Sequence, residues 1–156
     1  MKFYNKGNTF LEVIIVIGII VAISFVVLPS LSNFRDQQSL KNTTEDIVSI
    51  LNLARANTLS SLNSNYYSVH LESDKVTYFV GGTYTSGLST NKVINFDTNV
   101  TLPSANINLN ASSTDVTFDR LTGNTSDYGT ITIQLTKDSS KQKVITVSKT
   151  GLVSSN

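Results

Sequence analysis

An apolar run near the start of the chain predicts a helix that crosses a membrane. The nineteen residues from Phe10 to Leu28 carry no charge except at Glu12. At about 1.5 Å per residue, a helix of this length spans roughly 28 Å, which is close to the thickness of a hydrocarbon core. We therefore predict that residues 8–29 form a membrane-spanning segment.

The next stretch, residues 30–64, has the period of an amphipathic helix. Its apolar stripe consists of Leu31, Phe34, Leu40, Ile47, Leu51, Ala54, Thr58 and Leu62. Charged side chains such as Arg35, Lys41 and Glu45 occupy the other face. Proline lacks an N–H group and bends a helix, so we predict one nearly continuous helix from about residue 9 to residue 63 with a bend at Pro29.

From residue 65 to residue 156 the pattern changes to period two, which is typical of β-strands. We expect strands at 67–72, 76–80, 93–96, 100–102, 107–109, 116–118, 130–135 and 143–148, with a last edge at Leu152 and Val153. Gly81–Asn91 has the composition of a loop without core-forming residues. One long helix followed only by strands predicts an α+β fold, in which the helix packs on an antiparallel β-sheet.

The charges at the N-terminus predict the orientation of the apolar helix. Lys2 and Lys6 precede it, so the N-terminus is expected in the cytoplasm and residues 30–156 outside. Residues 1–7 are too short for an ordinary secretory leader. An alternative is a longer signal that ends at Ala22-Ile23-Ser24, but four more apolar residues follow that site.

Glu12 is the one charge inside the apolar run and needs an explanation. Inserting an acid well inside a membrane helix costs on the order of 2.5–3.5 kcal/mol, and such acids are by default functional. One interpretation is that Glu12 reaches the headgroup level and has no further role. The other is that it pairs with a free amine, which would be created by cutting the chain after Gly7.

The composition offers little chemistry. The chain lacks cysteine, has a net charge of +1 and is 15% charged, so we do not expect it to bind nucleic acid. His70 is the only histidine, and with Glu72 and a serine it could make a triad of a kind that any Ser-rich chain offers. Oxygen ligands of the kind that Ca²⁺ prefers occur at Asp115, Asp119, Asn124 and Asp127, but their spacing fits solvated turns better. We therefore expect no enzyme activity, metal or cofactor.

The segment from Lys6 through Gly7, Asn8 and Thr9 to Glu12, followed by an aliphatic helix, resembles the prepilin processing motif of type IV pilins and type II secretion pseudopilins. The resemblance implies that residues 1–7, with Lys2 and Lys6, are a basic leader. It implies cleavage between Gly7 and Asn8 by a prepilin peptidase, followed by N-methylation of Asn8.

The same resemblance gives positions to two further residues. Glu12 becomes the fifth mature residue and Pro29 the twenty-second, where this family has a glutamate and often a proline. The first mature residue is usually phenylalanine, and Asn8 in its place weakens the inference of methylation more than that of cleavage.

The C-terminal part is most similar to the FimT/GspH-type minor pseudopilins. The residues that carry this similarity are Leu53–Ala56, Val69, Leu71, Phe118–Gly123, Val144–Ser148 and Gly151–Val153. Some members of that group bind DNA through arginines beside the last glycine. No arginine follows Gly151 here, so the resemblance does not imply DNA binding.

Together these features imply a structural subunit, most similar to minor pilins or pseudopilins. Its expected partners are the prepilin peptidase, other pilin or pseudopilin subunits, an inner-membrane assembly platform and membrane lipid. We expect a single-pass protein of the inner membrane that later enters a filament. The alternative is a membrane-anchored extracytoplasmic binding domain that never polymerises, and the sequence leaves a pilus, a secretion pseudopilus and a competence system open.

Overall fold

A computed structural model describes residues 9–110 and 114–156. It contains two compact units, one reaching to Arg35 and one formed by Asp36–Asn156. The helix α1 spans Phe10–Leu59 and continues through Pro29. By length and composition it could cross a membrane.

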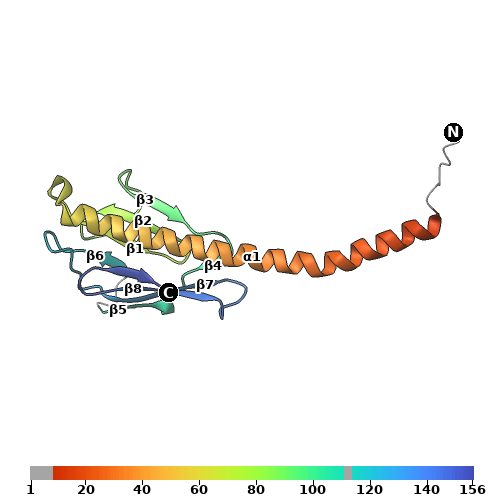
Figure 1. Cartoon of the computed structure of the whole chain (residues 1–156). Helices are drawn as coiled ribbons and strands as arrows, with labels where there is room; N and C mark the ends of the chain where they lie inside the picture. The colour runs from red at the N-terminus through yellow and green to blue at the C-terminus, as the bar shows by residue number, and fades with distance from the viewer. Residues whose placement is uncertain (1–8, 111–113) are drawn as a thin grey trace, which may run out of the picture. The chain divides into compact units, whose positions relative to one another are not determined.

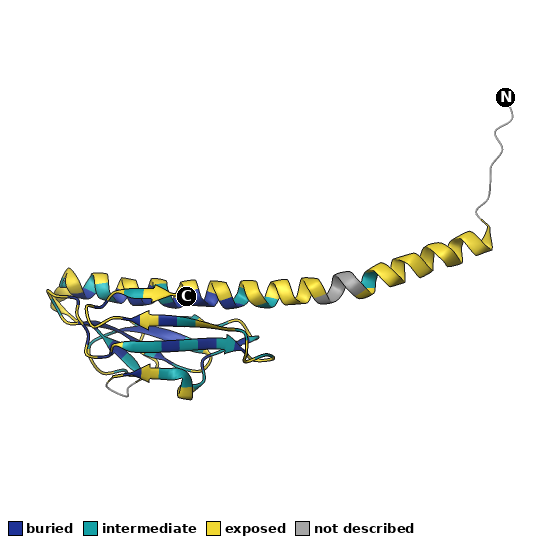
Figure 2. Ribbon diagram, turned by 60° about the horizontal axis from the view of Figure 1, so that its bottom comes forward, coloured by how far each residue is buried: buried dark blue, intermediate teal, exposed yellow. Residues whose placement is uncertain are grey.

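In the second unit, α1 packs through one face. Leu40, Ile47, Leu51, Ala54 and Thr58 are buried, which confirms the middle of the predicted stripe, and Ile50 beside it is buried as well. Leu31, Phe34 and Leu62 are exposed, so the stripe does not extend to its predicted ends. Figure 2 shows this alternation of buried and exposed positions along α1.

The helix ends at Leu59, four residues before the predicted end. The backbone turns left-handed at Ser61, and a short 3₁₀ helix, η1 (Leu62–Ser64), follows. Thr58 stabilises this exit because its buried hydroxyl accepts the N–H of Tyr67 at 2.9 Å and lies 3.1 Å from the Tyr67 carbonyl oxygen.

The strands form two antiparallel sheets rather than the single sheet predicted (Figure 1). The first has the order β3-β2-β1-β6, formed by Lys92–Asn95, Lys75–Val80, Tyr67–Leu71 and Asp115–Thr117. In the second, β4 (Val100–Thr101) and β5 (Ile107–Leu109) pair with β7 (Gly129–Leu135), which continues to β8 (Gln142–Val147) and β9 (Val153–Ser155). A second 3₁₀ helix, η2 (Ser104–Asn106), precedes β5.

The alternating residues of both sheets meet α1 in one core. Val69 and Leu71 of β1, Ile131 and Ile133 of β7, and Ile145 of β8 are buried and belong to the same apolar cluster as Leu51 and Ala54. The period-two pattern correctly placed Tyr67, Val69 and Leu71 on a buried face of β1, although Ser68 on the other face is buried as well. The α+β arrangement is confirmed.

Candidate functional site

The N-terminal half of α1 presents an apolar surface with no protein packed on it. From Phe10 to Phe25, every residue is exposed except Ser24, which is partly exposed. Phe10 has an exposed fraction of 81% and Phe25 of 76%. A helix that is apolar all round requires lipid or other helices around it.

Glu12 occupies the first turn of this helix. The Glu12 N–H donates to the Thr9 hydroxyl at 3.3 Å and to the Thr9 carbonyl oxygen at 3.0 Å. Thr9 therefore caps the helix, and Thr9-Phe10-Leu11-Glu12 has the sequence of a capping box. A carboxylate at this position also interacts favourably with the helix dipole. Sequence reasoning missed this local role, although the T-x-x-E spacing indicates it.

The other residues of the predicted processing site stay predictions. Lys2, Lys6, Gly7 and Asn8 lie outside the described residues. The assembly role expected of Pro29 also stays a prediction.

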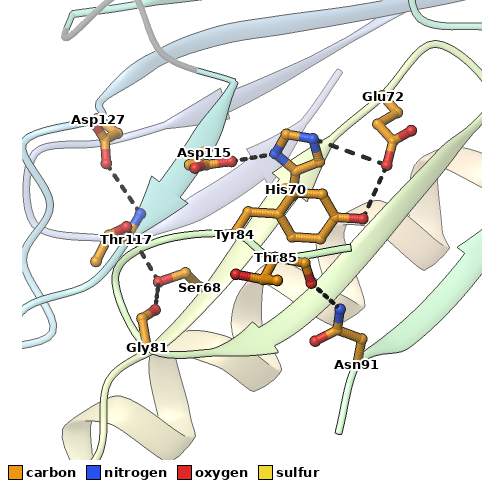
Figure 3. Close-up of polar contacts among 10 residues, drawn as sticks. All are labelled: Ser68, His70, Glu72, Gly81, Tyr84, Thr85, Asn91, Asp115, Thr117 and Asp127. Carbon is orange, nitrogen blue, oxygen red and sulfur yellow. Dashed lines mark hydrogen bonds and ion pairs between the residues drawn. The ribbon is translucent and has the colours of Figure 1, made fainter. Parts of the chain in front are cut away.

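A second candidate is the polar cluster around His70 on the first sheet (Figure 3). The His70 ring lies between two carboxylates, since Nδ1 contacts Asp115 and Nε2 lies 3.9 Å from Glu72. The Tyr84 ring stacks on the imidazole with a centroid distance of 3.9 Å. Tyr84 Oη also donates to Glu72 at 3.3 Å, so a single aromatic side chain covers the cluster.

This geometry differs from a catalytic triad. Both ring nitrogens of His70 face carboxylates. The hydroxyl of Ser68, two residues away on β1, donates instead to the Gly81 carbonyl oxygen at 2.8 Å. The residues thus form contacts that join β1, β2 and β6 and do not orient a nucleophile.

Glu72 also forms an ion pair with Lys75 at the edge of the cluster. Its second oxygen lies 3.2 Å from Lys75 Nζ, and this hydrogen bond raises the pKa of Lys75. On the side facing α1, burial raises the pKa of Tyr78, and a hydrogen bond from Asn57 to its hydroxyl partly offsets that effect. Both pKa values already lie above neutral pH, so raising them leaves Lys75 protonated and Tyr78 uncharged.

The Gly81–Asn91 loop contributes no residue to the apolar core, as predicted, but its Tyr84 packs outside that core on the first sheet. Tyr84 lies edge-on against the buried Phe79, with ring centroids 5.5 Å apart, and stacks on His70. Asn91 donates to the Thr85 carbonyl oxygen at 2.9 Å and closes the loop. The isolated tyrosine in a Gly/Ser/Thr segment was the available signal.

We expect Tyr84→Ala to loosen this loop without unfolding the core. Losing the two ring contacts should cost about 1–3 kcal/mol of unfolding free energy. Tyr84→Phe keeps both contacts and should cost less than about 1 kcal/mol. Hydrogen exchange of residues 81–91 measures the difference, and equal exchange in the two variants would contradict the role of the ring.

The four candidate calcium ligands do not converge. Asp115 contacts His70, whereas Asp127 accepts the Thr117 N–H at 3.0 Å. Asp119 and Asn124 join their turn through a backbone hydrogen bond. Within the described ranges, no group of three His, Cys, Asp or Glu residues could hold a metal ion.

Residues singled out by the family resemblance do meet at one place in the fold. Arg55 on α1 donates through Nε to the carbonyl oxygen of Gly123 and through Nη2 to that of Thr150, both at 3.2 Å. Gly123 and Gly151 both have left-handed backbones, with φ of +66° and +74°. These contacts fasten two distant turns to the helix.

Comparison with solved structures identifies the fold. Two crystal structures of the type IV minor pilin FimU from Pseudomonas aeruginosa match with a TM-score of 0.55, at 15% and 14% sequence identity. The matches cover 75% and 79% of this chain and 92% of the FimU chain. No protein-family model and no curated protein sequence matches. The chain therefore has a pilin-like fold.

Proposed function

We propose that this chain is a pilin-like filament subunit, cleaved after Gly7 by a prepilin peptidase and assembled through its N-terminal helix. The observation that carries the proposal is the exposed apolar surface of α1 from Phe10 to Phe25, attached to a domain with the fold of a minor pilin. The product is a type IV pilus or a type II secretion pseudopilus.

The apolar helix explains how one segment serves in two environments. Before assembly, lipid surrounds it as a single-pass anchor of the inner membrane, with residues 30–156 outside. In the filament, helices of neighbouring subunits replace the lipid contacts. An assembly platform in the membrane is the partner that transfers the subunit, because extraction into water would expose the whole apolar surface.

In this proposal, Glu12 determines which axial position a neighbouring subunit takes in the filament. Cleavage gives Asn8 of a neighbouring subunit a free amine, which pairs with the Glu12 carboxylate inside the apolar helix bundle. A neighbour at the wrong axial position leaves both charges unpaired, which is costly in a medium of low dielectric constant. The pair therefore sets the register between subunits.

We expect the mature protein from its native host to begin at Asn8. Intact-mass spectrometry of the purified full chain measures this directly and also reports a methyl group on the new N-terminus. A Gly7→Ala chain should remain uncleaved, whereas a Lys2→Ala chain, altered elsewhere in the leader, should still be cut. A wild-type protein that retains Met1 and residues 2–7 would refute the proposal.

That outcome would favour the second candidate, a membrane-anchored extracytoplasmic binding domain that does not polymerise. This candidate needs the same apolar helix but neither the cleavage nor a partner for Glu12. The two are therefore separated by the N-terminus of the mature chain.

A further inference from the structure

Several exposed apolar side chains of the domain lie at the end where α1 stops. In the described part of residues 36–156, the exposed large apolar residues are Leu53, Leu59, Leu62, Tyr66, Leu88, Val93, Leu121, Tyr128 and Leu152. We define the distal patch as Leu59, Leu62, Tyr66 and Leu121, together with Arg120. Leu121 is the most exposed of them, at 78%.

Side-chain contacts bring the segments of this patch together. The guanidinium carbon of Arg120 lies 6.0 Å from the centre of the Tyr66 ring, and Tyr67 Oη donates to the Leu62 carbonyl oxygen at 3.1 Å. Arg55 ties the turn that contains Leu121 to α1 through the Gly123 carbonyl oxygen. Figure 1 shows the end of α1 and the loop after β6 at the same end of the domain. These residues therefore form one surface.

The backbone of this surface is held in costly conformations. Among the described residues, the non-glycine positions with positive φ are Ser61, Asn63, Ser64 and Leu121. Leucine in the left-handed region costs roughly 1–2 kcal/mol, and asparagine or glycine would avoid much of that cost. A leucine that is both strained and solvent-exposed gains nothing for folding, so a binding role explains it better.

In the residues that the structure describes, the opposite end of the domain offers carboxylates but no apolar surface to this patch. It is formed by the turns 72–74, 97–99 and 136–141, which are joined by hydrogen bonds from Phe96 N to Asp74 O and from Thr136 N to Asn99 O. In the structure as described, these turns hold none of the exposed large apolar residues. A second copy stacked head to tail would therefore place polar turns on the leucines, and a two-fold contact between distal patches would oppose two Arg120 side chains.

Arg120 indicates the charge of the occupant. It forms a cation–π contact with Tyr66, and within residues 9–110 and 114–156 it makes no ion pair with a carboxylate. Its Nε atom is buried without a hydrogen-bond partner. Arginine and tyrosine are enriched where protein interfaces gain most of their binding energy.

We propose that the distal patch docks a different protein, whose contact face combines apolar side chains with a carboxylate that pairs with Arg120. This surface belongs to the folded domain and does not depend on whether the N-terminal helix polymerises. It is therefore separate from the function proposed above.

The test uses photo-crosslinking in intact cells of the native host, with the full chain. A photoreactive residue at Leu62 should capture one protein other than this chain, whereas the same residue at the exposed Ser139, in the opposite turns, should not capture it. Arg120→Glu should lower the yield about tenfold, the size expected for an interface arginine. In the captured protein, the carboxylate residue nearest Arg120 is then replaced by lysine. This replacement should lower the crosslinking yield with the wild-type chain and restore the yield with the Arg120→Glu chain.

Leu121→Asn separates binding from folding. Asparagine tolerates the left-handed backbone, so the variant should raise the melting temperature by roughly 2–5 °C while lowering the crosslinking yield. Capture of a second copy, no capture at Leu62, or failure of the charge exchange to restore the yield would each overturn the proposal. An undiminished yield with Leu121→Asn would overturn it as well.

Discussion

Gly151→Ala is expected to destabilise the domain by about 3–5 kcal/mol, which is a large part of the stability of a domain of this size. Gly151 has a φ of +74°, which alanine adopts only at a cost. Its added methyl group would also overlap the carbonyl oxygen of Gly123 and come within 2.8 Å of Arg55 Nε. Because Arg55 holds both glycine turns to α1, the clash would displace the helix from the second sheet or break these hydrogen bonds.

Gly87 provides a matched control for the backbone strain. It has a φ of +79°, but a methyl group there would meet nothing within 4 Å. Gly87→Ala should therefore cost only about 1 kcal/mol, the strain without the clash. Thermal and denaturant unfolding of the full chain in detergent measures both variants. Equal losses of stability at the two positions would show that the close approach to Gly123 and Arg55 is unimportant.

The local elements could be predicted because each depends on a short-range pattern. The period-two alternation located β1, β2, β7 and β8 to within one residue at each end, and the helical period of Leu40–Thr58 located the buried face of α1. The ends of the stripe were predicted less well. Leu31, Phe34 and Leu62 continue the same period but have no partner, because periodicity does not say where a sheet begins and ends.

The long-range contacts could not be predicted from such patterns. The division into two sheets depends on the turn after β6, where the chain leaves the first sheet and Gly123 meets Arg55, a residue 68 positions away. The covering of His70 by Tyr84 depends on a loop folding back over its own sheet. Both are contacts between distant segments, and only the complete fold brings those segments together.

Glu12 shows how a site residue can have two explanations that the sequence does not separate. Its position after Thr9 makes it part of a helix cap, and its position within an apolar helix makes it a candidate for pairing with a neighbouring Asn8 amine. The two roles differ in the free energy that each contributes. A favourable charge at a helix N-terminus contributes about 0.3–1 kcal/mol, whereas leaving one member of a buried ion pair without its partner costs roughly 3–5 kcal/mol.

We therefore expect Glu12→Ala to leave the precursor stable in the membrane and cleaved after Gly7, but to abolish its incorporation into filaments. The measurement is the amount of mature chain in sheared filaments relative to the amount in the membrane. A loss of 3–5 kcal/mol per subunit contact corresponds to more than a hundredfold change, so the expected result is absence and not a mild reduction.

Thr9→Ala is the matched control, because it removes the cap and retains the carboxylate. It should weaken the start of α1 by about 1 kcal/mol and still allow incorporation. If Thr9→Ala and Glu12→Ala reduce incorporation equally, the carboxylate acts only through the first turn of its own helix. Pairing across subunits predicts instead that the two variants differ widely, because only the loss of Glu12 leaves the neighbouring amine without a partner in the apolar bundle.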